Sequence, residues 1–535
     1  MYTRRDIAII FASLAALSFS AATLAQNLPK EEPGKRGGTL TMVVNPEPTT
    51  LVSAFDSGSS VGMVATKMFE GLVGYDFDLN PIPELATGWE WSADGLSVTF
   101  KLRKNVKWHD GKPMTSADVA YSMMNIWKTL HSYGRSAFAN VVAADTPDDH
   151  TVVFRLSKPS KYMMGNLNGY VSPVMPKHIY DGKDVRTNPA NAAPIGTGPF
   201  KLKEWSKGSF VRLERNPNYW RENRPYLDNL VVRFIPDAGA RAVAFESGEV
   251  QLGVFNSLPL NTVRRLEKSP NFEVNTMGYE FTSTIFMLEL NTRRAPFDKR
   301  EVRQAVMHAI DRQALINVVW QGFGKVSTGA VPSTVSKFYE KETPQYAFDP
   351  AKAEALLDAA GYPRKANGVR FKIVHDFLPY GSDLQRSAEF VKQQLAKVGI
   401  EVEIRSQDVA SFVKRVYTDY DFDMTNTHLS ALTDPTLGVQ RLYWSKNIVK
   451  GIPFSNATGY ANPEVDRLLE AAQVEPDDAK RVALFKEFQR VAQRDLPILN
   501  LFDMRPATVT SKKVRNHTLR GDAFFSSYAD VFINQ

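Results

Sequence analysis

The sequence predicts an α/β protein with more than one domain, on three observations. The chain has 535 residues, 43% hydrophobic and 23% charged, which is an ordinary globular composition but too long for one compact core. In its second half, short apolar strands alternate with amphipathic helices, as in a mostly parallel sheet covered by helices. In its first half, a capped helix lies between two alternating strands, which indicates a separate subdomain over residues 76–191.

The composition excludes several kinds of site. There is no cysteine, so disulfides, thiolate metal sites and a lipid-modified N-terminal cysteine are excluded. The net charge is +7, but the basic residues are interleaved with acidic ones, which argues against a nucleic-acid partner. The eight histidines include no pair at the spacing of a helical zinc site. We expect no cofactor and no resident metal, although a metal could arrive as a chelate with its own ligands.

The N-terminus has the layout of a secretory signal. Arg4 and Arg5 precede an apolar run over residues 7–22, which is shorter than the ~20 residues that a membrane-spanning helix needs. We therefore expect a signal peptide over residues 1–25 and a flexible leader over residues 26–38. The arginine pair also resembles a twin-arginine export signal, so two export routes stay open, both ending with a soluble protein in the periplasm.

The first elements after the leader are a short strand and a polar loop. The strand covers residues 39–44, and Glu47 follows in the loop. Ligand contacts in open α/β sheets come from loops at strand ends, so Glu47 is a candidate ligand-binding residue. Residues 98–102 and 152–156 then alternate as half-buried strands, and a capping box at residues 115–118 begins the helix between them.

Residues 194–220 contain a predicted β-hairpin. Apolar residues alternate with charged ones on both sides of a turn at Gly208, which is the period of two expected of half-buried strands. Two rigid loops flank the hairpin, and they read Gly196-Thr197-Gly198-Pro199 and Asn216-Pro217-Asn218-Tyr219-Trp220.

The second half carries clear helix boundaries. Asp311 and Asp349 are predicted N-caps, with Pro350 at the first helical position and Gly361 past the end of that helix. The remaining predicted elements are helices over residues 300–310, 382–398, 408–417 and 463–473, a longer helix that ends near residue 494, and strands over residues 371–374, 400–404, 422–425 and 496–502.

The segment from residue 426 to 444 is the strongest candidate for ligand contact. It follows a buried strand, and its polar and aromatic residues stand in an otherwise small or apolar stretch. The candidate ligand-binding residues in it are Asn426, His428, Asp434, Tyr443 and Trp444. The alternative, equally open, is a structural loop whose aromatic side chains belong to the core.

A secreted hydrolase is the rival class of function. Residues 58–62 match the G-x-S-x-G pattern of serine hydrolases, but no buried strand precedes them, so we interpret the match as chance. The carboxylate pair Asp421 and Asp423 is better explained as a solvated strand face than as a glycosidase dyad. We therefore predict no catalytic residues and no enzyme.

The chain resembles the family 5 extracytoplasmic solute-binding proteins of ABC importers, which include oligopeptide, dipeptide, nickel and opine receptors. The resemblance covers residues 38–509 and rests on the hairpin with its flanking loops and on matching stretches at residues 81–86, 108–113, 296–305, 349–363 and 462–466.

The resemblance implies an α/β fold with two lobes that close about a hinge, and an additional subdomain on the first lobe. We expect the first lobe to comprise residues 39–75, 192–288 and 515–535, the subdomain residues 76–191, and the second lobe residues 289–514. The implied function is capture of a peptide-like or other small polar solute by hinge closure and delivery to an inner-membrane permease. The protein would act as a monomer, and an opine, a sugar conjugate or a metal chelate stays open as the ligand.

One position departs from the family's peptide receptors. There, an aspartate three residues before the Asp/Glu-Pro pair grips the free amine of the peptide. The matching pair is Asp434-Pro435, and Ala431 stands three residues earlier. A desolvated amine without a charged partner costs several kcal/mol, so we hypothesise that this protein does not use that amine grip.

Overall fold

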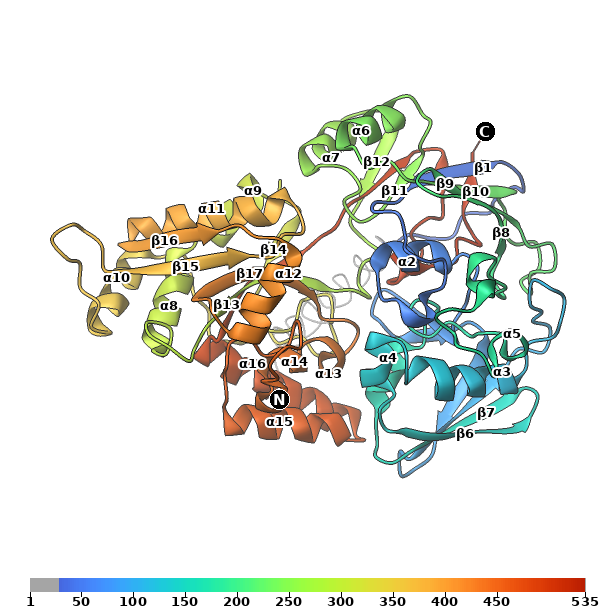
Figure 1. The fold of residues 1–535 in the computed structure, drawn as a ribbon, viewed down its shortest axis with the longest axis horizontal. Helices are drawn as coiled ribbons and strands as arrows, with labels where there is room; N and C mark the ends of the chain where they lie inside the picture. Colours follow the sequence, from blue (N-terminus) through green and yellow to red (C-terminus); the bar gives the residue numbers. More distant parts are fainter. Residues whose placement is uncertain (1–27, 535) are drawn as a thin grey trace, which may run out of the picture.

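The computed structural model describes residues 28–534, which form two lobes side by side (Figure 1). The predicted signal peptide, residues 1–25, lies outside the described residues. Within residues 28–534, no helix combines the length and apolarity needed to cross a bilayer.

The first lobe, as named here, is built on a seven-stranded sheet with the order β12-β19-β11-β1-β10-β9-β8. The central strand β1 is parallel to both of its neighbours, and the other pairings are antiparallel. The strands are β1 (Thr39–Val43), β8 (Phe200–Ser206), β9 (Phe210–Arg215), β10 (Asn229–Arg233), β11 (Leu252–Gly253), β12 (Phe272–Asn275) and β19 (Thr508–Ser511). Its helices are α2 (Ser59–Ala65), α6 (Ala238–Glu246) and α7 (Leu260–Glu267). The predicted hairpin is confirmed as the antiparallel pair β8 and β9.

A separate four-stranded antiparallel sheet with the order β4-β5-β7-β6 lies within residues 76–191. The sheet and the helices within these residues are β4 (Ala86–Trp91), β5 (Ser97–Leu102), α3 (Ser116–Tyr121), α4 (Ser132–Ala137), β6 (Val141–Asp148), β7 (Thr151–Leu156) and α5 (Lys177–Tyr180). The predicted capping box is present, because Thr115 and Asp118 each accept a backbone hydrogen bond from the other's position at the start of α3. Two-stranded pairs complete this side of the molecule: β2 (Val73–Tyr75) with β3 (Pro81–Pro83), and β20 (Val514–Arg515) with β21 (Phe532–Ile533).

The second lobe is built on a six-stranded sheet with the order β14-β18-β13-β17-β15-β16. Its strands are β13 (Thr284–Leu290), β14 (Gly324–Val326), β15 (Phe371–Phe377), β16 (Ile400–Arg405), β17 (Met424–Ser430) and β18 (Ile498–Met504). Its helices are α8 (Arg300–Ala309), α9 (Arg312–Val318), α10 (Pro350–Ala359), α11 (Ser382–Lys397), α12 (Val409–Val413), α13 (Pro435–Gly438), α14 (Gln440–Tyr443), α15 (Pro463–Val474) and α16 (Asp478–Asp495). The predicted N-caps Asp311 and Asp349 both accept a backbone hydrogen bond at the start of their helices.

The prediction of a mostly parallel second sheet is wrong. Only β15 with β16 and β15 with β17 are parallel, whereas the three pairings that involve β13 and β18 are antiparallel. The reason is that β13 and β18 are the two strands next to the crossings between the lobes, and they run in opposite directions. The alternation of strands and helices along the sequence indicates the parallel units of the sheet. It does not indicate the direction of β13 and β18, which join the sheet directly from the crossings between the lobes.

The crossings between the lobes also lie earlier in the sequence than the expected boundaries at residues 288/289 and 514/515. The whole of β13 pairs within the six-stranded sheet, and β19 pairs within the seven-stranded sheet. The chain therefore changes lobe near residues 280–284 and again near residues 504–508. The pattern of apolar residues in a strand does not indicate which sheet the strand joins. The boundaries expected from the sequence therefore differ from the observed crossings by several residues.

The two loops that flank the hairpin meet at one buried carboxylate, Glu70, which is 2% exposed. Its oxygens accept hydrogen bonds from the Thr197 hydroxyl at 2.8 Å, the Tyr219 hydroxyl at 2.7 Å and the Trp220 indole nitrogen at 3.0 Å. Burial, followed by the charge of Glu84, raises the pKa of Glu70 to about 7, and the three donors partly offset this rise. Gly196 lies against the Met68 carbonyl so closely that a β-carbon there would be 1.8 Å from the oxygen. Gly196, Tyr219 and Trp220 in the loops that flank the hairpin thus have a structural role.

We expect Glu70→Gln to lower the free energy of unfolding by about 2 kcal/mol, measured by urea denaturation at pH 8. Three donors converge on two carboxylate oxygens, and an amide replaces one of those acceptors with a donor. The matched control is Glu90→Gln, at an exposed position on β4, which should change stability by less than about 0.5 kcal/mol. Equal denaturation midpoints for the two variants would contradict this role of Glu70.

Candidate functional site

A cavity of about 800 Å³ lies between the two lobes. The first-lobe side contributes Ser57, Ser59, Ser132, Tyr133, Arg135, Ser136, Tyr162 and Asn166. The second-lobe side contributes Leu378, Tyr380, His428, Leu429, Ser430, Thr436, Leu437, Gln440, Arg441, Trp444, Asn447, Ile452, Pro453, Phe454 and Gln473. Helix α4 of the first side faces α13 of the second across this region (Figure 1). The cavity has the size and mixed aromatic and polar lining of a small-molecule site.

The lobes touch each other beside the cavity. The Thr433 hydroxyl donates to the Gly165 carbonyl at 3.1 Å, and Lys161 lies 3.8 Å from Asp478. Each of these pairs joins the first lobe to the second. The chain itself crosses between the lobes only near residues 280–284 and 504–508, so these contacts join two parts that are otherwise linked by two short crossings.

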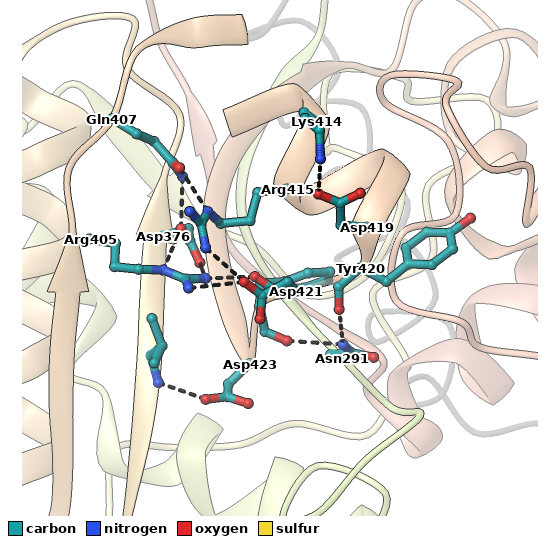
Figure 2. A network of polar contacts seen from close by, with 12 residues as sticks. Asn291, Asp376, Arg405, Gln407, Lys414, Arg415, Asp419, Tyr420, Asp421 and Asp423 are labelled. Carbon is teal, nitrogen blue, oxygen red and sulfur yellow. Dashed lines mark hydrogen bonds and ion pairs between the residues drawn. The ribbon is translucent and has the colours of Figure 1, made fainter. Parts of the chain in front are cut away.

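The second-lobe wall is positioned by β17, and a polar network fixes the start of that strand (Figure 2). Arg405 donates to Asp376 at 2.7 Å and also contacts Asp421 at 3.2 Å, and Arg415 binds Asp421 at 2.7 Å. Asp376 is fully buried, so its ion pair with Arg405 replaces the water that its charge has lost. The network joins the ends of β15 and β16 to the segment that leads into β17.

Two further contacts continue the network toward the strand. The carboxylate of Asp423 accepts from the Val374 backbone at 2.7 Å, and Asn291 donates to the Phe422 carbonyl at 2.9 Å. The pair Asp421 and Asp423 therefore serves as anchoring groups for β17. A fixed start places the far end of β17, residues 428–430, in the cavity wall.

Two of the predicted ligand-binding residues line the cavity, His428 and Trp444. Burial lowers the pKa of His428 to about 4, so its imidazole is neutral at pH 7. Among the described residues, Nδ1 of His428 has no hydrogen-bond partner. The indole nitrogen of Trp444 donates to Glu470 at 2.9 Å, which orients the ring.

The structure places the other four predicted residues away from the cavity lining. Asn426 is buried and donates to the Leu384 carbonyl at 3.1 Å, and Tyr443 is buried with its hydroxyl 3.0 Å from Asn500. Glu47 accepts from the Trp205 indole at 3.0 Å and from the Gly208 backbone at 2.9 Å, at the turn of the β8–β9 hairpin.

Asp434 differs most from the sequence expectation. Both of its oxygens accept from the buried guanidinium of Arg481, at 2.6 and 2.7 Å, and one also caps α13 through the Thr436 backbone. The two side chains are 8% and 4% exposed, respectively. A carboxylate held in this way is a structural anchor for the turn between β17 and α13, because the pair would be left unbalanced if a ligand amine took its place.

Sequence reasoning missed Arg135 and Arg441, which line opposite sides of the cavity. Arg441 was detectable, since it is the one lysine or arginine between residues 426 and 444. Arg135 gave no signal, because α4 meets the second lobe only in the folded chain.

Other sequence patterns acquire plain explanations. Ser60 of the G-x-S-x-G match lies within α2, and the residues before it form a short 3-10 turn rather than a strand, so the chance interpretation agrees with the structure. No group of three or more metal-ligating side chains occurs among residues 28–534.

The comparisons with known proteins agree on one family. The bacterial extracellular solute-binding proteins, family 5 Middle, match residues 80–451. The glutathione-binding protein GsiB of Pectobacterium atrosepticum is 29% identical over 490 residues, which cover 89% of this chain and 91% of that protein. A putative ABC transporter peptide-binding protein of Brucella ovis is 31% identical and covers 94% of each chain.

Solved structures give the same result. AgaA of A. tumefaciens R10, in complex with agropinic acid, is 28% identical with a TM-score of 0.74 and covers 93% of this chain and 99% of that one. DppA of Helicobacter pylori, in complex with the peptide STSA, is 26% identical with a TM-score of 0.77 and covers 94% of this chain and 99% of that one. The α/β fold predicted from the sequence is confirmed by these similarities.

We expect Asp434→Asn to lower the free energy of unfolding by about 3 kcal/mol, measured by denaturant titration, because it leaves the Arg481 guanidinium buried without a counter-charge. The matched control is Asp478→Asn on α16, where an exposed ion pair should contribute less than about 1 kcal/mol. A loss for Asp434→Asn no larger than that of the control would show that the buried pair is not an anchor.

The buried residue Glu289 lies on β13, opposite Thr425 of β17, and we expect it to make stability depend on pH. Burial raises its pKa to about 8, against the opposing effects of the Tyr417 hydroxyl and the Arg441 charge. A carboxyl group with a raised folded-state pKa stabilises the fold while protonated, and this stabilisation is lost as pH rises from about 4.5 through 8.

Glu289→Gln should therefore gain stability relative to the wild type as pH rises, by about 3 kcal/mol between pH 4.5 and 7. Denaturation midpoints measured at half-unit steps of pH test this. The control Glu273→Gln, at an exposed position on β12, should follow the wild-type profile. A constant offset between Glu289→Gln and the wild type would refute the raised pKa.

Proposed function

Because the chain belongs to the bacterial extracellular solute-binding proteins of family 5, we propose that the cavity between its lobes binds a peptide-like or other small polar solute. The protein is the substrate-binding component of an ABC importer and not an enzyme. The observation that carries the proposal is a cavity of about 800 Å³ whose walls come from both lobes.

The ligand contacts that we propose begin with His428 and Trp444 on the second-lobe wall. Trp444 offers a flat apolar surface with its orientation fixed by Glu470. His428 offers a neutral imidazole whose Nδ1 has no hydrogen-bond partner within residues 28–534, and this nitrogen is suited to a hydroxyl or amide group of a solute. On the first-lobe wall, Tyr133 and the serines that line the cavity supply further hydroxyl groups.

The mechanism that we propose is hinge closure. A solute that contacts both walls stabilises the closed arrangement, and it shifts the equilibrium only by the difference between its affinities for the two arrangements. The closed protein then presents both lobes together to an inner-membrane permease. We propose that it does so as a monomer.

The chemistry of the ligand is narrowed by Ala431. Its small apolar side chain is 2% exposed, at the turn after β17, where the family's peptide receptors carry their amine-gripping aspartate. Asp434, the nearest replacement in sequence, is already bound to Arg481. The second candidate is therefore an opine or sugar conjugate, and the similarity to the agropinic acid-binding AgaA supports it.

The export route is also a proposal. The family consists of bacterial extracellular proteins, and the basic and apolar pattern of residues 1–25 supports export into the periplasm. Both the general secretory route and the twin-arginine route are compatible with Arg4 and Arg5.

Isothermal titration with glutathione, a tetrapeptide and agropinic acid tests this function, together with small-angle scattering on the same samples. We expect at least one of these solutes to bind, to reduce the radius of gyration and to be recovered unchanged. Solute consumption would support the hydrolase alternative. An unchanged radius of gyration on binding would contradict closure.

A further inference from the structure

The lining of the cavity between the lobes is unbalanced in charge. Of the described residues that line it, Arg135 on α4 and Arg441 on α14 are basic, and none is an aspartate or glutamate. His428 is neutral at pH 7, as described above, so it neither adds to this charge nor offsets it. The cavity therefore carries two positive charges of its own, one on each lobe.

Neither arginine forms an ion pair with a carboxylate of residues 28–534. Arg441 donates one hydrogen bond in that range, from Nε to the Gly438 carbonyl at 3.3 Å, and both terminal nitrogens of its guanidinium are left for other partners. The side chain is partly buried, and this burial lowers the pKa of Arg441. Removing a cation from water without a counter-charge is costly, so a site of this kind is adapted to an anion that arrives with the ligand.

The carboxylates around the wall are committed to other groups. Asp434 is bound to Arg481, and Glu470 is paired with Lys446 at 2.6 Å and with the Trp444 indole. Asp56, next to the lining residue Ser57, accepts from the Thr49 hydroxyl at 2.8 Å and from the Gly58 backbone at 2.7 Å.

Glu289 is the carboxyl group whose charge acts on Arg441. It is 1% exposed, on β13, and one of its oxygens has no hydrogen-bond partner among the described residues. Its raised pKa keeps it mostly protonated at neutral pH, so it leaves the charge of Arg441 largely uncompensated.

On the basis of the proposed function, we propose that Arg441 binds a carboxylate of the transported solute and that this solute carries no free ammonium group. The ligand class is a carboxylate-bearing solute whose amine is absent or acylated. A guanidinium with two free terminal nitrogens matches the two oxygens of a carboxylate. A free ammonium group in the same cavity would lose water, find no carboxylate and be repelled by both arginines.

The position of Arg135 links this charge to closure. Arg135 and Arg441 lie on opposite walls, so approach of the lobes without a ligand brings two like charges closer together. An anion between them turns this repulsion into attraction. The same solute thus satisfies Arg441 and favours the closed arrangement.

A charge series on one peptide tests the proposal. The probes are trialanine, N-acetyltrialanine, N-acetyltrialanine amide and agropinic acid, measured by isothermal titration at constant ionic strength and pH 7. We expect N-acetyltrialanine or agropinic acid to bind, and the acetylated acid to bind at least about 10-fold more tightly than both trialanine and the neutral amide.

Variants connect the effect to the named residues. Arg441→Gln should weaken binding of the acid by about 100-fold and leave the amide within about 3-fold of the wild type. Arg135→Gln, at an exposed position, should weaken binding of the acid by about 10-fold. This second variant keeps the proposal testable if Arg441→Gln unfolds. The control Arg467→Gln removes the same charge from the exposed face of α15 and should have no effect.

Three results would overturn the inference. These are tighter binding of trialanine than of its acetylated form, full affinity of Arg441→Gln for the acid, and no binding of either N-acetyltrialanine or agropinic acid. Tight binding of trialanine or glutathione with closure would leave the proposed function standing, so the two failures are distinguishable.

Discussion

The need of a buried charge for a partner organises both lobes of this protein. In the first lobe, Glu70 collects three donors from the loops on either side of the β8–β9 hairpin, and this holds the hairpin against the segment that follows α2. In the second lobe, the buried ion pairs Asp376–Arg405 and Asp434–Arg481 do the same work at the two ends of β17. Each of these carboxylates is stable inside the protein because hydrogen-bond donors surround it. The donors come from other segments of the chain, so the same interactions also fix where those segments lie.

In the site, these interactions separate structural residues from cavity-lining residues along residues 424–444. Residues 424–427 of β17 are buried next to the network at the start of the strand, and His428 is the first partly exposed residue of the strand. Asp434 then fixes the turn into α13 and α14, so that Arg441 and Trp444 reach the cavity from a rigid support. The residues that hold the wall and the residues that line the cavity are therefore interspersed along residues 424–444.

The sequence alone could predict those features that depend on residues close together in the chain. Local patterns were sufficient for the hairpin, for the capping box at Thr115 and for the N-caps Asp311 and Asp349, because each depends on neighbours in sequence. The antiparallel pairing of β13 depends on contacts between segments far apart in the chain, so it was not predictable from alternation.

The site was only partly predictable for the same reason. The segment from residue 426 to 444, which the sequence predicts as a ligand contact, contributes to the cavity lining, but its polar residues could not be sorted into anchors and lining residues without Leu384, Arg481 and Asn500. Arg135 comes from the opposite side of the cavity and is linked to Arg441 only through the folded structure.

A ligand shifts the hinge only if it contacts both walls. A solute that bound Arg441 alone would therefore fill the cavity without closing it, whereas one whose charge also reaches Arg135 would gain affinity in the closed arrangement. Selection for closure is in this way selection for a negative charge placed between the lobes.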